Sequence, residues 1–143
     1  MAESEMAQPI QQLIADLIAA WNSHDVERVA AFYAPDYEET DVAQAKVQRG
    51  REGIRRTAAL YLRAFPDLQV TLNDLVIDGN RAALIWSWCG THRGTFMRIP
   101  PTGRAVAVRG ASFLIIEDGQ IRRGARIWDL AGLLRAIGLL PEL

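Results

Sequence analysis

Asp118-Gly119-Gln120-Ile121 begins the stretch of sequence that decides the fold, and Trp128-Asp129-Leu130-Ala131-Gly132-Leu133-Leu134-Arg135-Ala136-Ile137-Gly138 ends it. The residues from Glu117 to Gln120 have the composition of a hairpin turn, so a strand over Ile121–Trp128 is expected to pair with the strand before it. Asp129 stands where the N-cap of a helix is expected. A short helix from about Leu130 to Ile137 then ends at Gly138. The stretch therefore predicts that an antiparallel sheet is followed directly by a C-terminal helix.

Apolar residues before this stretch recur with the period of strands. The expected strands are Leu68–Ile77, Arg81–Phe96, Arg104–Ile116 and Ile121–Trp128, joined by turns into an antiparallel meander. In the second strand, Ala82, Leu84, Trp86 and Trp88 face one side, and Ala83, Ile85 and Cys89 face the other. Apolar residues on both sides indicate that both faces of the sheet are covered. Because the helices can cover only one face, we expect a partner subunit on the other, and therefore a homodimer.

Three helices are expected ahead of the sheet. The first has an apolar stripe with steps of three and four, made of Ile10, Leu13, Ile14, Leu17, Ile18 and Trp21. The second is short, runs from Val26 to about Tyr33 and is ended by Pro35. The third runs from Arg51 to Phe65, after a polar stretch from about Tyr37 to Arg49. Helices followed by an antiparallel sheet indicate the α+β class.

Composition argues against several classes of function. With 143 residues, half of them hydrophobic, the chain fits a single domain over residues 1–143. Its 16 basic and 17 acidic residues leave a net charge of -1, which does not favour binding to nucleic acid or to an anionic membrane. No apolar run approaches the ~20 residues of a membrane span, so we expect a cytoplasmic protein. The single cysteine, Cys89, excludes a disulfide within the chain and does not favour a Cys/His metal cluster.

Several short motifs together resemble one family. They are Phe32-Tyr33-Ala34-Pro35-Asp36-Tyr37, Gly50 with Gly53, Phe65-Pro66-Asp67, Gly90-Thr91-His92-Arg93-Gly94, Pro100-Pro101-Thr102-Gly103 and the C-terminal stretch. Over nearly its whole length the chain resembles the SnoaL-like polyketide cyclases of the NTF2-like superfamily. The resemblance implies a cone in which three N-terminal helices pack on a curved antiparallel sheet, with a short C-terminal helix and a ligand pocket at the mouth. It also implies chemistry without a metal or a cofactor.

The resemblance places unusual residues at the site of the ring-closing aldol cyclases. Arg126 stands where they carry a catalytic acid/base aspartate, and Ser112 stands where they carry a histidine in the preceding strand. Gly110 stands at the position of a second polar pocket residue. A guanidinium stays protonated at neutral pH and cannot act as a base. The ordinary aldol cyclisation is therefore not expected of this chain.

Glu39 is the alternative acid/base that the sequence offers. It stands at a position that the cyclases fill with a pocket asparagine, and on an extended segment it shares one face with Tyr37 and Asp41. Our hypothesis is that Glu39 exchanges protons while Arg126 orients it or binds an enolate or carboxylate oxygen. Histidine suits proton transfer near neutral pH, so His92 is a third catalytic candidate. The competing interpretation makes Glu39 a solvent-exposed loop residue, Arg126 a surface arginine and His92 a structural residue.

Aromatic residues and one hydroxyl are candidates for substrate binding. They are Tyr37, Trp21, Trp86, Trp88, Tyr61, Ser112 and Trp128, and Tyr33 is a further aromatic residue that could line the pocket. Large aromatic residues at regular spacing are more often core, so only some of these should contact a ligand.

The family contains aldol cyclases and hydroxylation proteins, and its wider relatives include ketosteroid isomerase and limonene epoxide hydrolase, so the fold leaves the reaction open. We expect a cyclase or isomerase of polyketide-type secondary metabolism, acting on a hydrophobic small molecule. An epoxide-opening enzyme is one alternative, because limonene epoxide hydrolase uses an aspartate–arginine–aspartate relay and this chain keeps an arginine, although at a position where that enzyme places an acid. A non-catalytic accessory protein that binds hydrophobic ligands is the other.

Overall fold

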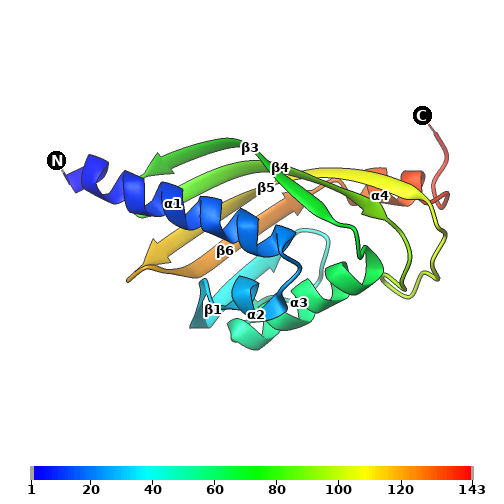
Figure 1. Cartoon of the computed structure of the whole chain (residues 1–143), viewed down its shortest axis with the longest axis horizontal. Coiled ribbons are helices and arrows are strands. Elements are labelled where there is room, and N and C mark those ends of the chain that lie inside the picture. Colours follow the sequence, from blue (N-terminus) through cyan, green and yellow to red (C-terminus); the bar gives the residue numbers. More distant parts are fainter. Residues whose placement is uncertain (1, 143) are drawn as a thin grey trace.

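Three helices lie on the concave side of a curved six-stranded sheet, and a fourth lies at one end of it (Figure 1). This computed structural model describes residues 2–142. The elements in chain order are α1 (Ala2–Asn22), α2 (Val26–Ala30), β1 (Tyr33–Asp41), β2 (Gln48–Arg49), α3 (Gly50–Ala64), β3 (Gln69–Asp78), β4 (Arg81–Thr91), β5 (Ala105–Glu117), β6 (Gln120–Trp128) and α4 (Leu130–Ala136). The α+β cone, with its three N-terminal helices and short C-terminal helix, is confirmed.

The predicted meander forms most of the sheet, whose strand order is β2-β1-β6-β5-β4-β3. Strands β3 to β6 pair antiparallel in sequence order, as expected. Strand β1 instead runs parallel to β6, with Asp41 paired to Arg126. The register shifts between β3 and β4 and between β5 and β6, and such bulges increase the twist and bend of a sheet.

The prediction for the segment around Pro35 is wrong. The second helix ends at Ala30 rather than at about Tyr33, and Tyr33 instead begins strand β1. The expected polar stretch contains the rest of β1, which includes the predicted extended segment, and the short strand β2. Tyr37, Glu39 and Asp41 are buried and alternate with exposed residues, which is the period of a strand with one covered face. Pro35 is tolerated because it lies where the register between β1 and β6 shifts.

Strand β4 also ends earlier than predicted, at Thr91 rather than Phe96. The chain turns there because the N–H groups of Arg93 and Gly94 both donate to the carbonyl of Ala64 at the end of α3. This joins the end of α3 to the loop that follows β4.

The core lies between the helices and the concave face. The apolar stripe of α1 packs there through Ile10, Ile14 and Leu17, all of which are buried. A second cluster around Phe65, Trp88 and Phe96 fills the end of the cone near α4. Between residues 2 and 142, no helix combines the length and the apolar character that a membrane-spanning segment needs.

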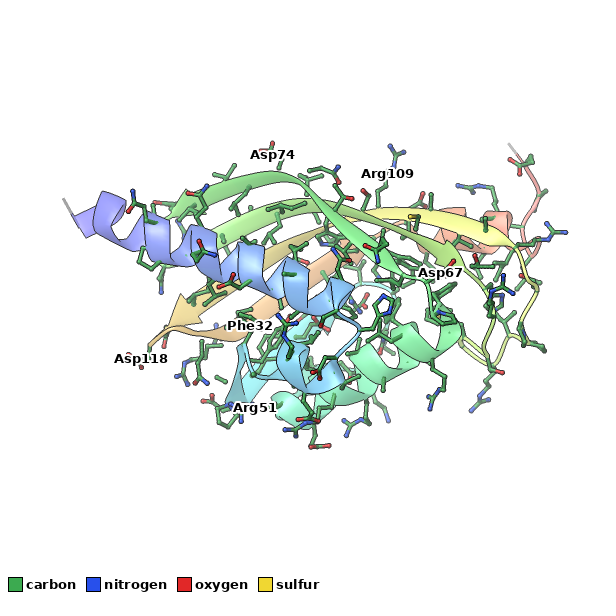
Figure 2. The ribbon with its side chains drawn as sticks, viewed as in Figure 1. Phe32, Arg51, Asp67, Asp74, Arg109 and Asp118 are labelled. Atoms are coloured by element: carbon green, nitrogen blue, oxygen red, sulfur yellow. The ribbon has the colours of Figure 1, made fainter. Side chains whose placement is uncertain are left out.

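The convex face of the sheet stays uncovered in the single chain. Figure 2 shows Asp74 and Arg109 directed away from the helices on this side. Large apolar side chains on the same face, Val76, Ile85, Phe113 and Ile127, are exposed. The predicted division of β4 into two apolar faces is therefore present, with Ile85 exposed and Leu84 buried. The expectation that a partner covers the convex face stays a prediction.

Candidate functional site

A cavity of about 100 Å³ lies between α1, α3 and the concave face of the sheet. Its lining residues are Leu17, Ile18, Trp21, Tyr33, Glu39, Ile54, Thr57, Tyr61, Leu68, Val70, Leu84, Trp86, Trp88, Ser112, Leu114 and Arg126. An engineered apolar cavity of about 150 Å³ holds benzene, so this space is on the scale of one small ring. A larger ligand would require side chains to move.

Strand register brings the polar lining residues to one wall. Asp41 of β1 is paired to Arg126 of β6, which is paired to Ser112 of β5, which is paired to Leu84 of β4. Cross-strand partners place their side chains on the same face of the sheet. One row of the concave face therefore runs from two charged groups through a hydroxyl to an apolar side chain.

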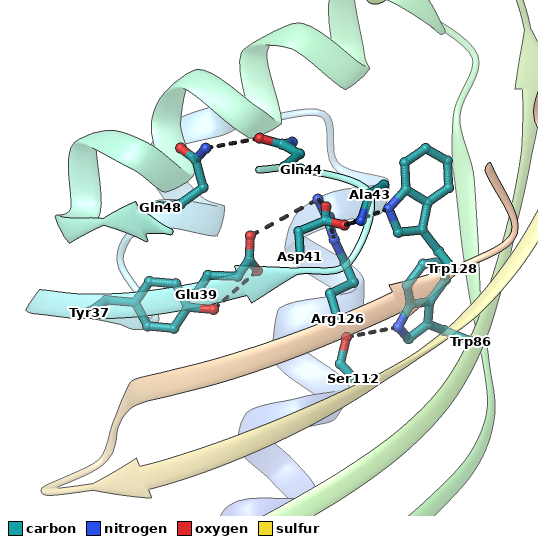
Figure 3. A network of polar contacts seen from close by, with 10 residues as sticks. All are labelled: Tyr37, Glu39, Asp41, Ala43, Gln44, Gln48, Trp86, Ser112, Arg126 and Trp128. Carbon is teal, nitrogen blue, oxygen red and sulfur yellow. Dashed lines mark hydrogen bonds and ion pairs between the residues drawn. The ribbon is translucent and has the colours of Figure 1, made fainter. Parts of the chain in front are cut away.

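Asp41 and Arg126 form a buried ion pair behind the cavity wall (Figure 3). The Arg126 Nη2 and Nε atoms donate to Asp41 Oδ2 over 2.7 and 3.2 Å. Asp41 Oδ1 accepts from the indole Nε1 of Trp128 at 3.0 Å and from the backbone N–H of Ala43 at 2.9 Å. Each of the two carboxylate oxygens of Asp41 therefore accepts two hydrogen bonds. Because the carboxylate is fixed in this way, it holds the Arg126 guanidinium in place. Asp41 lies on the face that was predicted for it, with Tyr37 and Glu39, but its role as the partner of Arg126 was not predicted.

Glu39 lines the cavity and has much weaker partners than Asp41. It is 8% exposed. Tyr37 donates its hydroxyl hydrogen to Oε1 at 3.1 Å, and Arg126 Nη2 lies 4.0 Å from Oε2, beyond hydrogen-bonding distance. Burial raises the pKa of Glu39 above its ordinary value of 4.5, and the nearby Arg126 and the Tyr37 hydrogen bond offset only part of this. Glu39 is thus a carboxyl group whose protonated form is favoured more than that of an exposed glutamate.

Arg126 stays charged in this setting. Burial lowers the pKa of Arg126, but the neighbouring Tyr61, Glu39 and Asp41 together raise it above its ordinary value. Its guanidinium carbon lies 5.5 Å from the centre of the Tyr61 ring, and burial raises the pKa of Tyr61 to about 12. Among residues 2–142, the hydrogen bonds of Arg126 use Nε and Nη2, which leaves Nη1 for a ligand.

Trp86 and Ser112 form a second polar contact on the same wall. The indole Nε1 of Trp86 donates to Ser112 Oγ at 2.9 Å. Gly110 makes room for the indole, because a Cβ at that position would lie 2.6 Å from Trp86 Cη2. The position that the resemblance identifies with a polar pocket residue therefore serves here to seat a tryptophan.

The structure brings most of the predicted site residues together. Glu39, Arg126, Trp21, Trp86, Trp88, Tyr61 and Ser112 line the cavity. Tyr37 and Trp128 do not line it, since each lies behind a carboxylate to which it donates a hydrogen bond. Tyr33, which was also expected to be able to line the pocket, does so. Thr57 of α3 lines the cavity as well and was not predicted.

His92 lies outside the cavity, beyond the end of β4. Its ring is buried, and Nδ1 lies 3.0 Å from the hydroxyl of Thr102 and accepts from the Thr102 N–H at 3.2 Å. The ring also packs against Phe65. These contacts tie the 100–103 turn to the end of β4, so the structure offers a structural role for His92 and no path to the cavity.

Among the side chains of residues 7–142, no three from His, Cys, Asp or Glu are grouped in a way that could hold a metal ion. The two inward carboxylates, Glu39 and Asp41, share their surroundings with the guanidinium of Arg126, which supplies the positive charge at this place.

Comparison with known proteins gives a family and several solved structures. The model of the family described as SnoaL-like polyketide cyclase matches residues 11–137. TsrD from Streptomyces laurentii is 32% identical, with a TM-score of 0.84 over 93% of this chain and 97% of that chain. IdmH from Streptomyces antibioticus, provisionally named a polyketide cyclase, is 31% identical, with a TM-score of 0.77 over 92% and 99%. AclR from Streptomyces galilaeus, provisionally named a hydroxylase, is 27% identical, with a TM-score of 0.85 over 96% and 89%. Comparison with proteins of curated function gives no match.

Proposed function

Because the chain belongs to the SnoaL-like polyketide cyclase family, we propose that it is an enzyme that cyclises or isomerises a hydrophobic carbonyl compound of polyketide-type secondary metabolism by acid/base chemistry. Glu39 is the acid/base, and Arg126 binds the carbonyl oxygen. The observation that supports this most directly is a buried carboxyl group in an otherwise largely apolar cavity, next to an arginine that another carboxylate already neutralises.

The proposed reaction begins with proton abstraction. The Glu39 carboxylate removes a proton from the carbon next to the substrate carbonyl, and the electrons of the broken C–H bond pass to the carbonyl oxygen. Arg126 donates to the enolate oxygen that results, which lowers the energy of the charge as it develops. Glu39 is then a neutral acid, as burial favours.

The enolate then has two outcomes, and both regenerate the carboxylate. In an isomerisation, Glu39 returns its proton to a different carbon of the substrate. In a cyclisation, the enolate carbon forms a C–C bond to a second carbonyl of the same molecule, and Glu39 gives its proton to the alkoxide produced. The large aromatic side chains Trp21, Trp86 and Trp88 supply an apolar surface on which a flat substrate can lie.

The test is deuterium exchange at the carbon between the carbonyls of a small aromatic β-keto ester, followed by NMR in deuterium oxide. We expect the wild-type protein to accelerate exchange and Glu39→Gln to lose ~100-fold or more, because general acid/base groups contribute on this order. Glu38→Gln is the matched control, since Glu38 directly precedes Glu39 in β1 and its side chain is exposed. Exchange that is unchanged in Glu39→Gln would contradict the proposal. Binding of the ester without exchange would favour the non-catalytic accessory protein.

One observation favours epoxide opening as a second candidate. Arg126 lies between two carboxylates, Glu39 and Asp41, and an acid–arginine–acid array is the arrangement that the epoxide-hydrolase alternative uses. Glu39 would activate a water molecule there. Incorporation of the label from isotopically labelled water into a diol product separates this reaction from cyclisation, which takes up no water oxygen.

The convex face supports a homodimer as the working assembly. Its apolar groove is lined by Val76, Ala83, Ile85, Ala111, Phe113, Ala125 and Ile127, with Asp74 at its edge. An exposed apolar patch of this kind on a small protein is typical of an interaction surface, and a second copy is its occupant in this proposal. The rotational symmetry of a dimer would place the two convex faces against each other and leave both cavities open to ligand.

A further inference from the structure

We propose that Ser112 is the second donor to the substrate oxygen beside Arg126, and that Trp86 sets the direction of its hydroxyl. This inference rests on the proposed function and adds a requirement on the substrate. The ligand must present a carbonyl or enolate oxygen to the β5–β6 wall of the cavity and its apolar part to the helices.

Strand pairing places the two donors side by side. Ser112 and Arg126 are cross-strand partners on the concave face, and both line the cavity. The Cβ atoms of directly opposed residues lie roughly 4.5–5.5 Å apart, so both side chains leave the sheet at the same part of the cavity wall. The Arg126 guanidinium extends from there toward Asp41 of β1, and in the proposal the substrate oxygen lies between it and the Ser112 hydroxyl. Figure 3 shows Ser112 and Arg126 on neighbouring strands with Glu39 on the far side of the guanidinium.

The contact with Trp86 fixes the direction of the Ser112 hydroxyl. An indole N–H can only donate, so Ser112 Oγ must be the acceptor of the 2.9 Å hydrogen bond. One lone pair of the hydroxyl is then occupied, and its own hydrogen must point elsewhere. Among residues 2–142, no hydrogen-bond acceptor is in contact with that hydroxyl, so it is free to donate to a ligand.

Gly110 determines where the indole lies. Trp86 and Gly110 are cross-strand partners, and a Cβ on Gly110 would lie 2.7 Å from Trp86 Cζ2 and 2.7 Å from the carbonyl oxygen of Ile127. The second contact is to backbone, which cannot move without disturbing β6. Gly110, Trp86 and Ser112 therefore act together to keep the hydroxyl hydrogen of Ser112 directed away from the indole.

Charge balance is consistent with an oxygen that becomes negative during the reaction. Before proton transfer the negative charges are on Glu39 and Asp41, and Arg126 offsets one of them. After transfer Glu39 is neutral and the negative charge is on the substrate oxygen, so the net charge of the site does not change. The hydrogen bonds from the two donors become stronger as negative charge develops on that oxygen, which favours the enolate over the ketone.

The probe for this site is para-nitrophenol, a single-ring compound whose phenolate is coloured and resembles an enolate oxygen in charge. We expect the wild-type protein to bind the phenolate in preference to the phenol, so that the bound probe ionises at a lower pH than the free probe, by about one unit or more. Ser112→Ala should return about half a unit to one unit of that shift, because one hydrogen bond to the oxygen is lost.

Two further variants separate the proposed device from a general effect on the cavity. Trp86→Phe keeps an aromatic ring but frees the hydroxyl, so it should change the ionisation of the probe in the same direction as Ser112→Ala, by a smaller amount. Ser87→Ala is the matched control, because Ser87 is cross-strand to Arg109 and does not line the cavity. It should leave the titration unchanged. Toluene binding, measured for every variant, shows whether the apolar cavity is intact.

Three results would overturn the inference: no binding of para-nitrophenol by the wild-type protein, preferential binding of the neutral phenol, or a Ser112→Ala titration equal to that of the wild type while toluene still binds. The outcome for Glu39 is separate. Glu39→Gln removes a like charge and should strengthen phenolate binding whether or not Glu39 is the base. A failed exchange assay with a positive phenolate titration would therefore reject the proposed reaction and keep the oxygen site.

Discussion

Two carboxylates on the same face of β1 have opposite surroundings. Asp41 accepts hydrogen bonds from Arg126, Trp128 and the backbone of Ala43, and its side chain is fully buried. Glu39, two residues earlier, accepts only from Tyr37 among residues 2–142 and faces the cavity. A carboxylate whose lone pairs are satisfied keeps its charge and serves as an anchor. A carboxyl group that is buried with few donors has a raised pKa, because burial disfavours its charged form.

The raised pKa of Glu39 predicts a pH-dependent change in stability. Above the ordinary value of 4.5, the folded protein holds a proton on Glu39 that the unfolded chain has lost, so the free energy of unfolding falls as pH rises through this interval to the folded-state pKa. Glu39→Gln cannot titrate. Its stability relative to the wild type should therefore increase as pH rises above about 4.5, and level off once Glu39 is ionised in the folded protein as well, in urea unfolding at each pH. Glu38→Gln should show no such trend. A constant difference for Glu39→Gln would mean that its pKa is not raised.

Removing the charge of Asp41 should destabilise the protein strongly. In Asp41→Asn the shape is kept, but the guanidinium of Arg126 loses its close counter-ion while it remains buried. Breaking a buried pair from one side costs about 3 kcal/mol or more. The control is Asp36→Asn, whose contact with Arg122 is exposed and should contribute less than about 1 kcal/mol. The measurement is the free energy of unfolding in urea, and equal losses for the two variants would contradict the anchoring role.

At the scale of elements, β5 matters because a glycine within it seats a tryptophan from β4. Gly110→Ala would force the new methyl group against Trp86 and against the backbone of Ile127, so we expect a loss of about 1–3 kcal/mol. Gly53→Ala in α3 is the matched substitution. Its methyl group would meet Gln48 at an ordinary 3.6 Å, and we expect a gain of up to about 1 kcal/mol from reduced backbone freedom. Thermal unfolding distinguishes the two, and a stabilised Gly110→Ala would show that the space beside Trp86 is not filled.

At the scale of the whole molecule, the uncovered convex face predicts a dimer. Sedimentation at micromolar concentration should give about 32 kDa, twice the 15.9 kDa of one chain. Ile127→Glu places a charge in the centre of the groove and should give the monomer mass, whereas Val42→Glu should leave the dimer intact. Val42 is a matched control because Ile127 and Val42 are 61% and 62% exposed, while Ile127 lines the groove and Val42 does not. A wild-type monomer would overturn the assembly.

Local features of the fold were predictable from the sequence. The turn at Asp118-Gly119 has both residues at positive φ, 52° and 72°, as a tight hairpin with these residue types requires. Asp129 accepts from the Gly132 N–H at 2.8 Å and caps α4 as expected. Such features depend on residues a few positions apart, so their residue types and spacing suffice to specify them.

Only the tertiary structure decided which polar groups of the site contact one another. The hydrogen bonds between Asp41 and Arg126 join residues that are 85 positions apart in the sequence. They depend on the parallel pairing of β1 with β6, which no local sequence pattern predicts. The same pairing puts Glu39 against the cavity and Tyr37 behind it, although both stand on one face of the strand. The sequence by itself determined the helices, the hairpins and the apolar stripes, because these follow from local backbone preferences and periodicity. Which polar groups meet, and how deeply each is buried, depends on strand register and sheet curvature, which form only when the whole chain packs.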